Sequence, residues 1–99
     1  MNKETVVDNL AKTNKSEYNY LKLIEELAEL NEVLIKTLTK GKAHKPPISK
    51  IIEESAHVIF RTNVLIEMLD IRKEVKVEYQ TKADYLHDFY EKNMYIGGL

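Results

Sequence analysis

Acidic side chains gather at two places in the sequence, each time with the spacing of a single helix face. Glu26 and Glu29 stand three residues apart, and Glu54 and His57 repeat that spacing farther along the chain. Residues three or four positions apart lie on the same face of an α-helix. Two antiparallel helices joined by a short loop would bring the two groups opposite each other. Because crowded carboxylates repel, we expect a positive charge among them. Mg²⁺ is the natural candidate, since it binds carboxylates together with substrate phosphates.

Spacing alone leaves two interpretations of these clusters open. In one, the carboxylates hold a metal ion, which polarises a phosphoryl group for attack by a positioned water. In the other, they form solvated helix faces with Lys or Arg partners one turn away. The basic segment between the clusters also has two interpretations. It is either a solvated loop or a mobile lid over an anionic ligand. Its basic residues are Lys40, Lys42, His44 and Lys45.

An all-α fold is expected to position these groups. Hydrophobic periodicity predicts a short helix in a lead-in segment, residues 1–15, followed by three long helices. No segment has the signals of a strand and hairpin. The long helices are expected over about residues 17–39, 50–69 and 73–93, with a frayed tail at 95–99.

Particular residues mark the expected helix ends. Ser16 and Ser49 are predicted N-caps, because their hydroxyls can accept a hydrogen bond from the first turn. Gly41 stands where a C-cap glycine belongs. The proline pair that follows excludes a helix interior in the linker. Residues 70–73 are predicted to form a tight turn.

Apolar residues occupy broad stripes on the long helices, and these stripes are the expected core. A stripe wider than one narrow face packs against more than one neighbour, which in a short chain indicates a partner subunit. The main stripe of the first long helix is Tyr20, Ile24, Leu27, Ala28, Leu34, Ile35 and Leu38. The stripes of the next two are Ile52, Ala56, Ile59, Phe60, Asn63 and Ile66, and Val75, Tyr79, Ala83, Leu86, Tyr90 and Met94.

Composition narrows the class of protein. A length of 99 residues predicts one domain, 1–99, and the near balance of 15 Lys+Arg against 16 Asp+Glu argues against a general nucleic-acid binder. There is no Cys for a disulfide or a thiolate zinc site. No apolar run is long enough for a membrane span, and the N-terminus lacks the core of a signal peptide. We therefore expect a cytoplasmic protein with neither nucleic-acid nor membrane partners.

The two clusters together resemble the motifs of a known family. The first reads Glu-Glu-Leu-Ala-Glu and ends at Glu29, and the second reads Glu-Glu-Ser-Ala-His and ends at His57. In this order, they are similar to the all-α nucleoside triphosphate pyrophosphohydrolases of the MazG type. In that family, Glu-x-x-Glu is followed, a loop later, by Glu-x-x-Asp. The similarity covers residues 20–90 and is greatest to the short, phage-encoded members.

The resemblance implies both an assembly and an activity. Protomers of the family associate into homodimers or homotetramers with four-helix-bundle-type sites, and they cleave a (d)NTP or related nucleotide to the monophosphate and pyrophosphate with Mg²⁺. Glu26, Glu29 and Glu54 match the metal-binding and catalytic positions of the family, and His57 takes the fourth metal position. Further candidates, for contacts to the nucleotide phosphates, are Lys22, Arg61 and Lys82.

His57 departs from the family pattern, which has Asp there. Imidazole is a poor ligand for Mg²⁺ and suits transition metals better, which makes Mn²⁺ an alternative. Three interpretations follow. The enzyme works with one fewer carboxylate or with Mn²⁺. Or hydrolysis is lost and the chain only binds a nucleotide, without a cofactor, as a phage protein that sequesters a nucleotide signal would. Or His57 is a tolerated surface residue.

Overall fold

The described part of the chain forms four α-helices, as expected for an all-α protein. The computed structural model describes residues 2–93, without the side chains of Lys3, Glu4 and Asn93, and contains no strand within that range. Met94 and the tail expected at 95–99 lie outside the described residues. The helices are α1 (Lys3–Thr13), α2 (Ser16–Thr39), α3 (Ile48–Leu69) and α4 (Arg72–Asn93), with a 3₁₀ turn, η1 (Lys42–His44), between α2 and α3.

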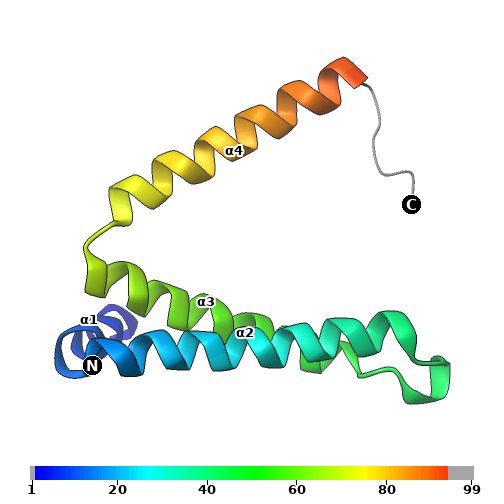
Figure 1. Ribbon diagram of the computed structural model, residues 1–99, viewed down its shortest axis with the longest axis horizontal. Helices are drawn as coiled ribbons and strands as arrows, with labels where there is room; N and C mark the ends of the chain where they lie inside the picture. The colour runs from blue at the N-terminus through cyan, green and yellow to red at the C-terminus, as the bar shows by residue number, and fades with distance from the viewer. Residues whose placement is uncertain (1, 94–99) are drawn as a thin grey trace.

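The long helices α2 and α3 form an antiparallel hairpin, and α1 packs at the end of the hairpin where α3 leads into α4 (Figure 1). α4 leaves that end at a wide angle, so that the chain is V-shaped (Figure 1). Within the described residues, α4 contacts α3 and no other helix. None of the described helices combines the length and the apolar character that crossing a bilayer requires.

The helix ends differ in detail from the capping predictions. The predicted N-caps Ser16 and Ser49 are wrong: Lys15 and Pro47 occupy these positions, and neither makes a side-chain capping bond. Pro47 suits the start of α3 because its missing N–H costs nothing there. Gly41 does follow the end of α2, but with a φ of −67°. The chain leaves α2 in an extended conformation and therefore needs no left-handed glycine.

The turn between α3 and α4 is tight, as predicted, and several interactions fix it. Asp70 adopts the left-handed conformation, with a φ of 54°. Its N–H bonds the carbonyl of Glu67 at 3.2 Å, and the N–H of Ile71 bonds that of Ile66, also at 3.2 Å. Arg72 then donates to Glu67 at 2.7 Å. These bonds close the end of α3 and set the direction in which α4 departs.

The core of the single chain lies on a different helix face from the one expected. Val33 and Val64 are buried, together with the polar Asn19 and Glu54. The predicted core stripes face outward instead. Ile24 of α2 is 60% exposed, and Ile59 of α3 is 62% exposed. The stripes expected as core are therefore not buried within the single chain, because α2 and α3 meet along the sides that carry Val33 and Glu54.

A buried amide joins three of the helices. The side chain of Asn19, which is 1% exposed, accepts a hydrogen bond from Asn14 at 3.0 Å. Its Nδ2 donates to the carbonyl of Leu10 at 3.3 Å and lies 3.2 Å from the sulfur of Met68. The contacts tie α1 and α3 to the start of α2, and the bonds offset the cost of burying a polar group.

Candidate metal centre between α2 and α3

The antiparallel hairpin brings the two acidic clusters together. Glu26 and Glu29 come from α2, and Glu54 and His57 from the facing stretch of α3. Nδ1 of His57 lies 3.3 Å from Oε2 of Glu26 and 3.9 Å from Oε2 of Glu54. One ligand atom from each of these three residues lies within 4.8 Å of the others. Oxygen and imidazole nitrogen ligands so arranged can bind a divalent cation.

Burial separates the inner carboxylates from ordinary surface acids. Glu54 is only 4% exposed. Its Oε2 and Oε2 of Glu26 are both buried, and neither has a hydrogen-bond partner among the described residues. On its other oxygen, Glu54 lies 3.5 Å from Nζ of Lys50. A buried carboxylate oxygen without a partner is costly, so these two oxygens are suited to a bound cation.

The neighbouring outer carboxylates behave as a solvated face would. Glu25 pairs with Lys22 at 3.4 Å, and Glu53 pairs with Lys50 at 3.3 Å. Both are exposed. Each cluster therefore contains one exposed acid, as expected for a solvated face, and one inner acid in a different environment. The outer acid of each has a lysine partner one turn away, and the inner acid points into the helix contact.

Glu29 completes the acidic group from the rim. A side-chain hydrogen bond with Glu54 raises the pKa of Glu29, and partial desolvation and the charges of Glu26, Glu54 and Glu25 act in the same direction. Apart from the desolvation, these causes come from carboxylates crowded at one end of the group, and a bound cation would relieve their repulsion.

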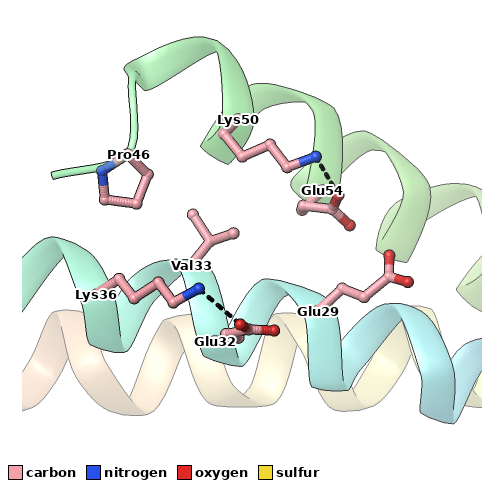
Figure 2. Close-up of a pocket in the computed structure, with 7 residues that line it drawn as sticks. All are labelled: Glu29, Glu32, Val33, Lys36, Pro46, Lys50 and Glu54. Carbon is pink, nitrogen blue, oxygen red and sulfur yellow. Dashed lines mark hydrogen bonds and ion pairs between the residues drawn. The ribbon is translucent and has the colours of Figure 1, made fainter. Parts of the chain in front are cut away.

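A cavity of about 310 Å³ opens beside this pair. Figure 2 shows Glu29 and Glu54 turned toward each other across the gap between α2 and α3. Two lysines stand on the walls of the cavity: Lys36, which pairs with Glu32 at 2.7 Å, and Lys50. Sequence reasoning missed both. The spacing could have identified them, because each lysine stands four residues from a glutamate, Lys36 from Glu32 and Lys50 from Glu54, and side chains so spaced lie on one helix face.

The cavity is bordered at one end by the linker between the helices. Pro46 lines it directly (Figure 2). The basic residues of the linker are all exposed. The structure thus places the linker next to the acidic group, where either a solvated loop or a lid is geometrically acceptable.

The three candidates for phosphate contacts have different positions. Arg61 is half-buried on α3, and its buried Nη1 has no hydrogen-bond partner among the described residues. Lys22 pairs with Glu25 and lies 5.5 Å from the centre of the Tyr18 ring. Lys82 belongs to α4, which does not contact α2, so a single chain does not bring Lys82 to the acidic group. Arg61 is the candidate with an unused donor.

No protein-family model matches the sequence, and no curated protein or solved structure is significantly similar to the chain. The site therefore has to be interpreted from its own geometry and from the motif resemblance alone.

Proposed function

We propose that the chain binds a divalent cation between α2 and α3 and, through it, a nucleotide. Glu26, Glu54 and His57 hold the cation, and Glu29 supports it from the rim of the cavity. One observation carries the proposal: two buried carboxylate oxygens and an imidazole nitrogen converge, and the two oxygens have no hydrogen-bond partner among the described residues. Because His57 supplies nitrogen, Mn²⁺ is expected to bind more tightly than Mg²⁺.

A nucleotide is the ligand class that suits both charges of the site. Its phosphates can contact a cation held by the carboxylates and the ammonium groups of Lys36 and Lys50, which line the cavity. This ligand is also the one that the MazG-like motifs imply. The cavity of about 310 Å³ is at the lower end of the range for small-molecule sites and is sufficient for the phosphate part of a nucleotide.

The activity proposed first is MazG-like pyrophosphohydrolysis. Water attacks the α-phosphorus of a (d)NTP, the bond between that phosphorus and the bridging oxygen breaks, and the products are a monophosphate and pyrophosphate. Glu29 accepts a proton from the water, and Lys36 and Lys50 hold the leaving phosphates. The cation supplies charge neutralisation at the phosphoryl oxygens. A carboxylate with a raised pKa binds a proton more readily than an ordinary carboxylate does, which suits this role.

A non-catalytic nucleotide-binding protein is the second candidate, and His57 favours it. The imidazole stands where a fourth carboxylate would, and it lies against Glu26. The imidazole can donate a hydrogen bond to this carboxylate without a metal. Such a chain would bind and sequester a nucleotide intact.

Two experiments test the cation and the chemistry separately. Calorimetric titration with MnCl₂ or MgCl₂ should show binding to the wild type and loss of binding in Glu54→Gln. Glu53→Gln, which neutralises the exposed neighbour on the same helix turn, is the matched control and should bind normally. Equal affinity in wild type and Glu54→Gln, or no binding by the folded wild type, contradicts the cation site.

Turnover is then measured on a nucleotide panel, including cyclic nucleotides, with and without divalent ions. Pyrophosphate release that needs a divalent ion and disappears in Glu29→Ala supports the enzyme. Binding without turnover, with intact nucleotide recovered after denaturation, supports the sequestering protein. If the folded chain neither binds nor converts any member of the panel, both nucleotide proposals are rejected.

A further inference from the structure

A second hollow of the molecule is a groove between α1 and α3, at the end of the hairpin where these helices pack together (Figure 1). Its volume is about 530 Å³, which is typical of small-molecule sites. The lining is apolar except for one amide and consists of Val6, Val7, Ala56, Ile59, Phe60 and Asn63. A groove of this kind suits a flat, largely apolar ring with a polar edge.

The groove begins next to the candidate metal centre on the surface of α3. His57, a ligand of the proposed cation, and Phe60, which lines the groove, are three residues apart on this helix. Side chains so spaced are neighbours, with their Cβ atoms roughly 5–6 Å apart. The imidazole is 48% exposed, so this edge of the metal centre is accessible from outside. A ligand bound to the cation can therefore extend past Phe60 into the groove.

Arg61 lies at the boundary between the metal centre and the groove. It follows His57 by four residues, which places the two side chains on the same side of α3. Its guanidinium carbon is 5.6 Å from the centre of the Phe60 ring. The surface of α3 thus passes from a cation site, through a guanidinium group, to an aromatic ring and an apolar groove. The parts of a nucleotide follow the same order, from the phosphates through the sugar to the base.

We infer that the groove between α1 and α3 binds the base of the nucleotide whose phosphates bind at the cation site. Phe60 and Ile59 supply apolar contacts to the ring, because every base has a face on which such side chains can pack. The amide of Asn63 contributes a donor and an acceptor for the edge of the base. The inference rests on the proposed function and adds to it the subsite that selects the base.

Calorimetric titration of the full chain in MnCl₂ tests the inference with two kinds of probe. Inorganic tripolyphosphate reports the phosphates alone. The α,β-methylene analogues of dATP, dGTP, dCTP and dTTP report the whole nucleotide and resist the proposed cleavage. In the wild type, at least one analogue should bind roughly tenfold more tightly than tripolyphosphate. Ile59→Asp should abolish this advantage, because it places a charge in the groove, and should leave the affinity for tripolyphosphate unchanged.

The same helix offers a matched control for the added charge. Ile52 is 63% exposed, against 62% for Ile59, and is not among the residues that line the groove. Ile52→Asp should therefore bind both kinds of probe like the wild type. Phe60→Leu, which removes the ring and keeps an apolar side chain, should reduce the advantage of the analogues. Asn63→Ala should bring the affinities of the four analogues closer together, since an edge contact that distinguishes the bases is lost.

The outcomes separate this inference from the proposed function. If tripolyphosphate binds as tightly as every analogue, the base makes no contact, and the inference is wrong while the cation–phosphate site stands. If an analogue keeps its advantage in both Ile59→Asp and Phe60→Leu, or loses it equally in Ile52→Asp, the base does not lie in the groove. If the wild type binds neither kind of probe, the (d)NTP site itself is rejected, and the inference with it.

Discussion

Neighbouring carboxylates of the same helix turn can have opposite environments. Glu53 is exposed beside Lys50, and Glu54 is buried against α2 with one oxygen lacking a hydrogen bond among the described residues. The sequence identifies both as acidic but does not distinguish them, because the distinction depends on which side of α3 meets α2. The spacing of the acidic residues therefore predicts that carboxylates converge. It does not predict which of these carboxylates become buried.

In the proposed cation site, His57 is the residue that we expect to set the metal preference. We expect His57→Asp to raise the affinity for Mg²⁺ by roughly tenfold, about 1.4 kcal/mol, because a hard oxygen ligand replaces a nitrogen ligand beside Glu26. The preference for Mn²⁺ over Mg²⁺ should fall at the same time. Competitive calorimetric titrations of the two ions measure both effects. His87→Asp, on an exposed histidine of α4, is the control and should change neither ion's affinity.

At the scale of elements, the sequence was informative about where helices run and less so about how they end. The ranges of the three long helices agree with the expected ones to within two residues. Apolar periodicity is a property of the whole segment and survives local exceptions. Caps depend on the conformation of one or two residues. The conspicuous serines at positions 16 and 49 lie inside the helices, and Lys15 and Pro47 precede them.

The junction of α1, α2 and α3 depends on a single amide that sequence reasoning did not single out. Replacing Asn19 with Ala removes the bonds to Asn14 and Leu10 and leaves their groups partly unsatisfied. We expect a loss of about 1–3 kcal/mol in the free energy of unfolding. Urea denaturation followed by circular dichroism measures it. Asn31→Ala, at an exposed asparagine of the same helix, should cost much less, and equal losses would contradict the role given to Asn19.

The α3–α4 turn should depend on pH through Glu67. Its hydrogen bond with Arg72 lowers the pKa of Glu67 below the ordinary value of 4.5. A folded-state pKa below the unfolded one means that the stabilisation is fully present above pH 4.5 and is lost as the pH falls through the folded-state pKa. Denaturation midpoints should therefore be higher for wild type than for Glu67→Gln at neutral pH and should converge in strong acid.

A matched comparison isolates that effect from the titration of other carboxylates. Glu78→Gln neutralises an exposed carboxylate of α4, and its midpoint should stay close to that of the wild type over the same pH range. A difference between wild type and Glu67→Gln that persists unchanged in strong acid would show that the ion pair does not stabilise the turn.

For the whole molecule, the number of helices was predictable and the core was not. Each long helix has apolar residues over more than one side, so periodicity alone cannot say which side contacts a neighbour of the same chain. The α2–α3 contact uses the side with Val33 and Glu54, and the broader stripes remain outside. The left-handed turn at Asp70 then carries α4 away from them. Hydrophobic periodicity does not distinguish an apolar side that packs within the chain from one that stays exposed.

Stability of the whole molecule should consequently depend on concentration. If a partner copy covers the exposed apolar residues of α2, α3 and α4, as the wide stripes predict, folding and association are linked, and the midpoint temperature rises with chain concentration. For a dimer, a hundredfold increase in concentration contributes about 2.7 kcal/mol, which corresponds to a rise of several degrees for a chain of this size. Thermal unfolding followed by circular dichroism at micromolar and submillimolar concentrations measures the shift. Val77→Asp should keep this dependence and Tyr79→Asp should lose it, because only Tyr79 lies in the apolar stripe of α4. A wild-type midpoint that stays constant over that range would mean that each chain is stable alone, with its apolar faces in water.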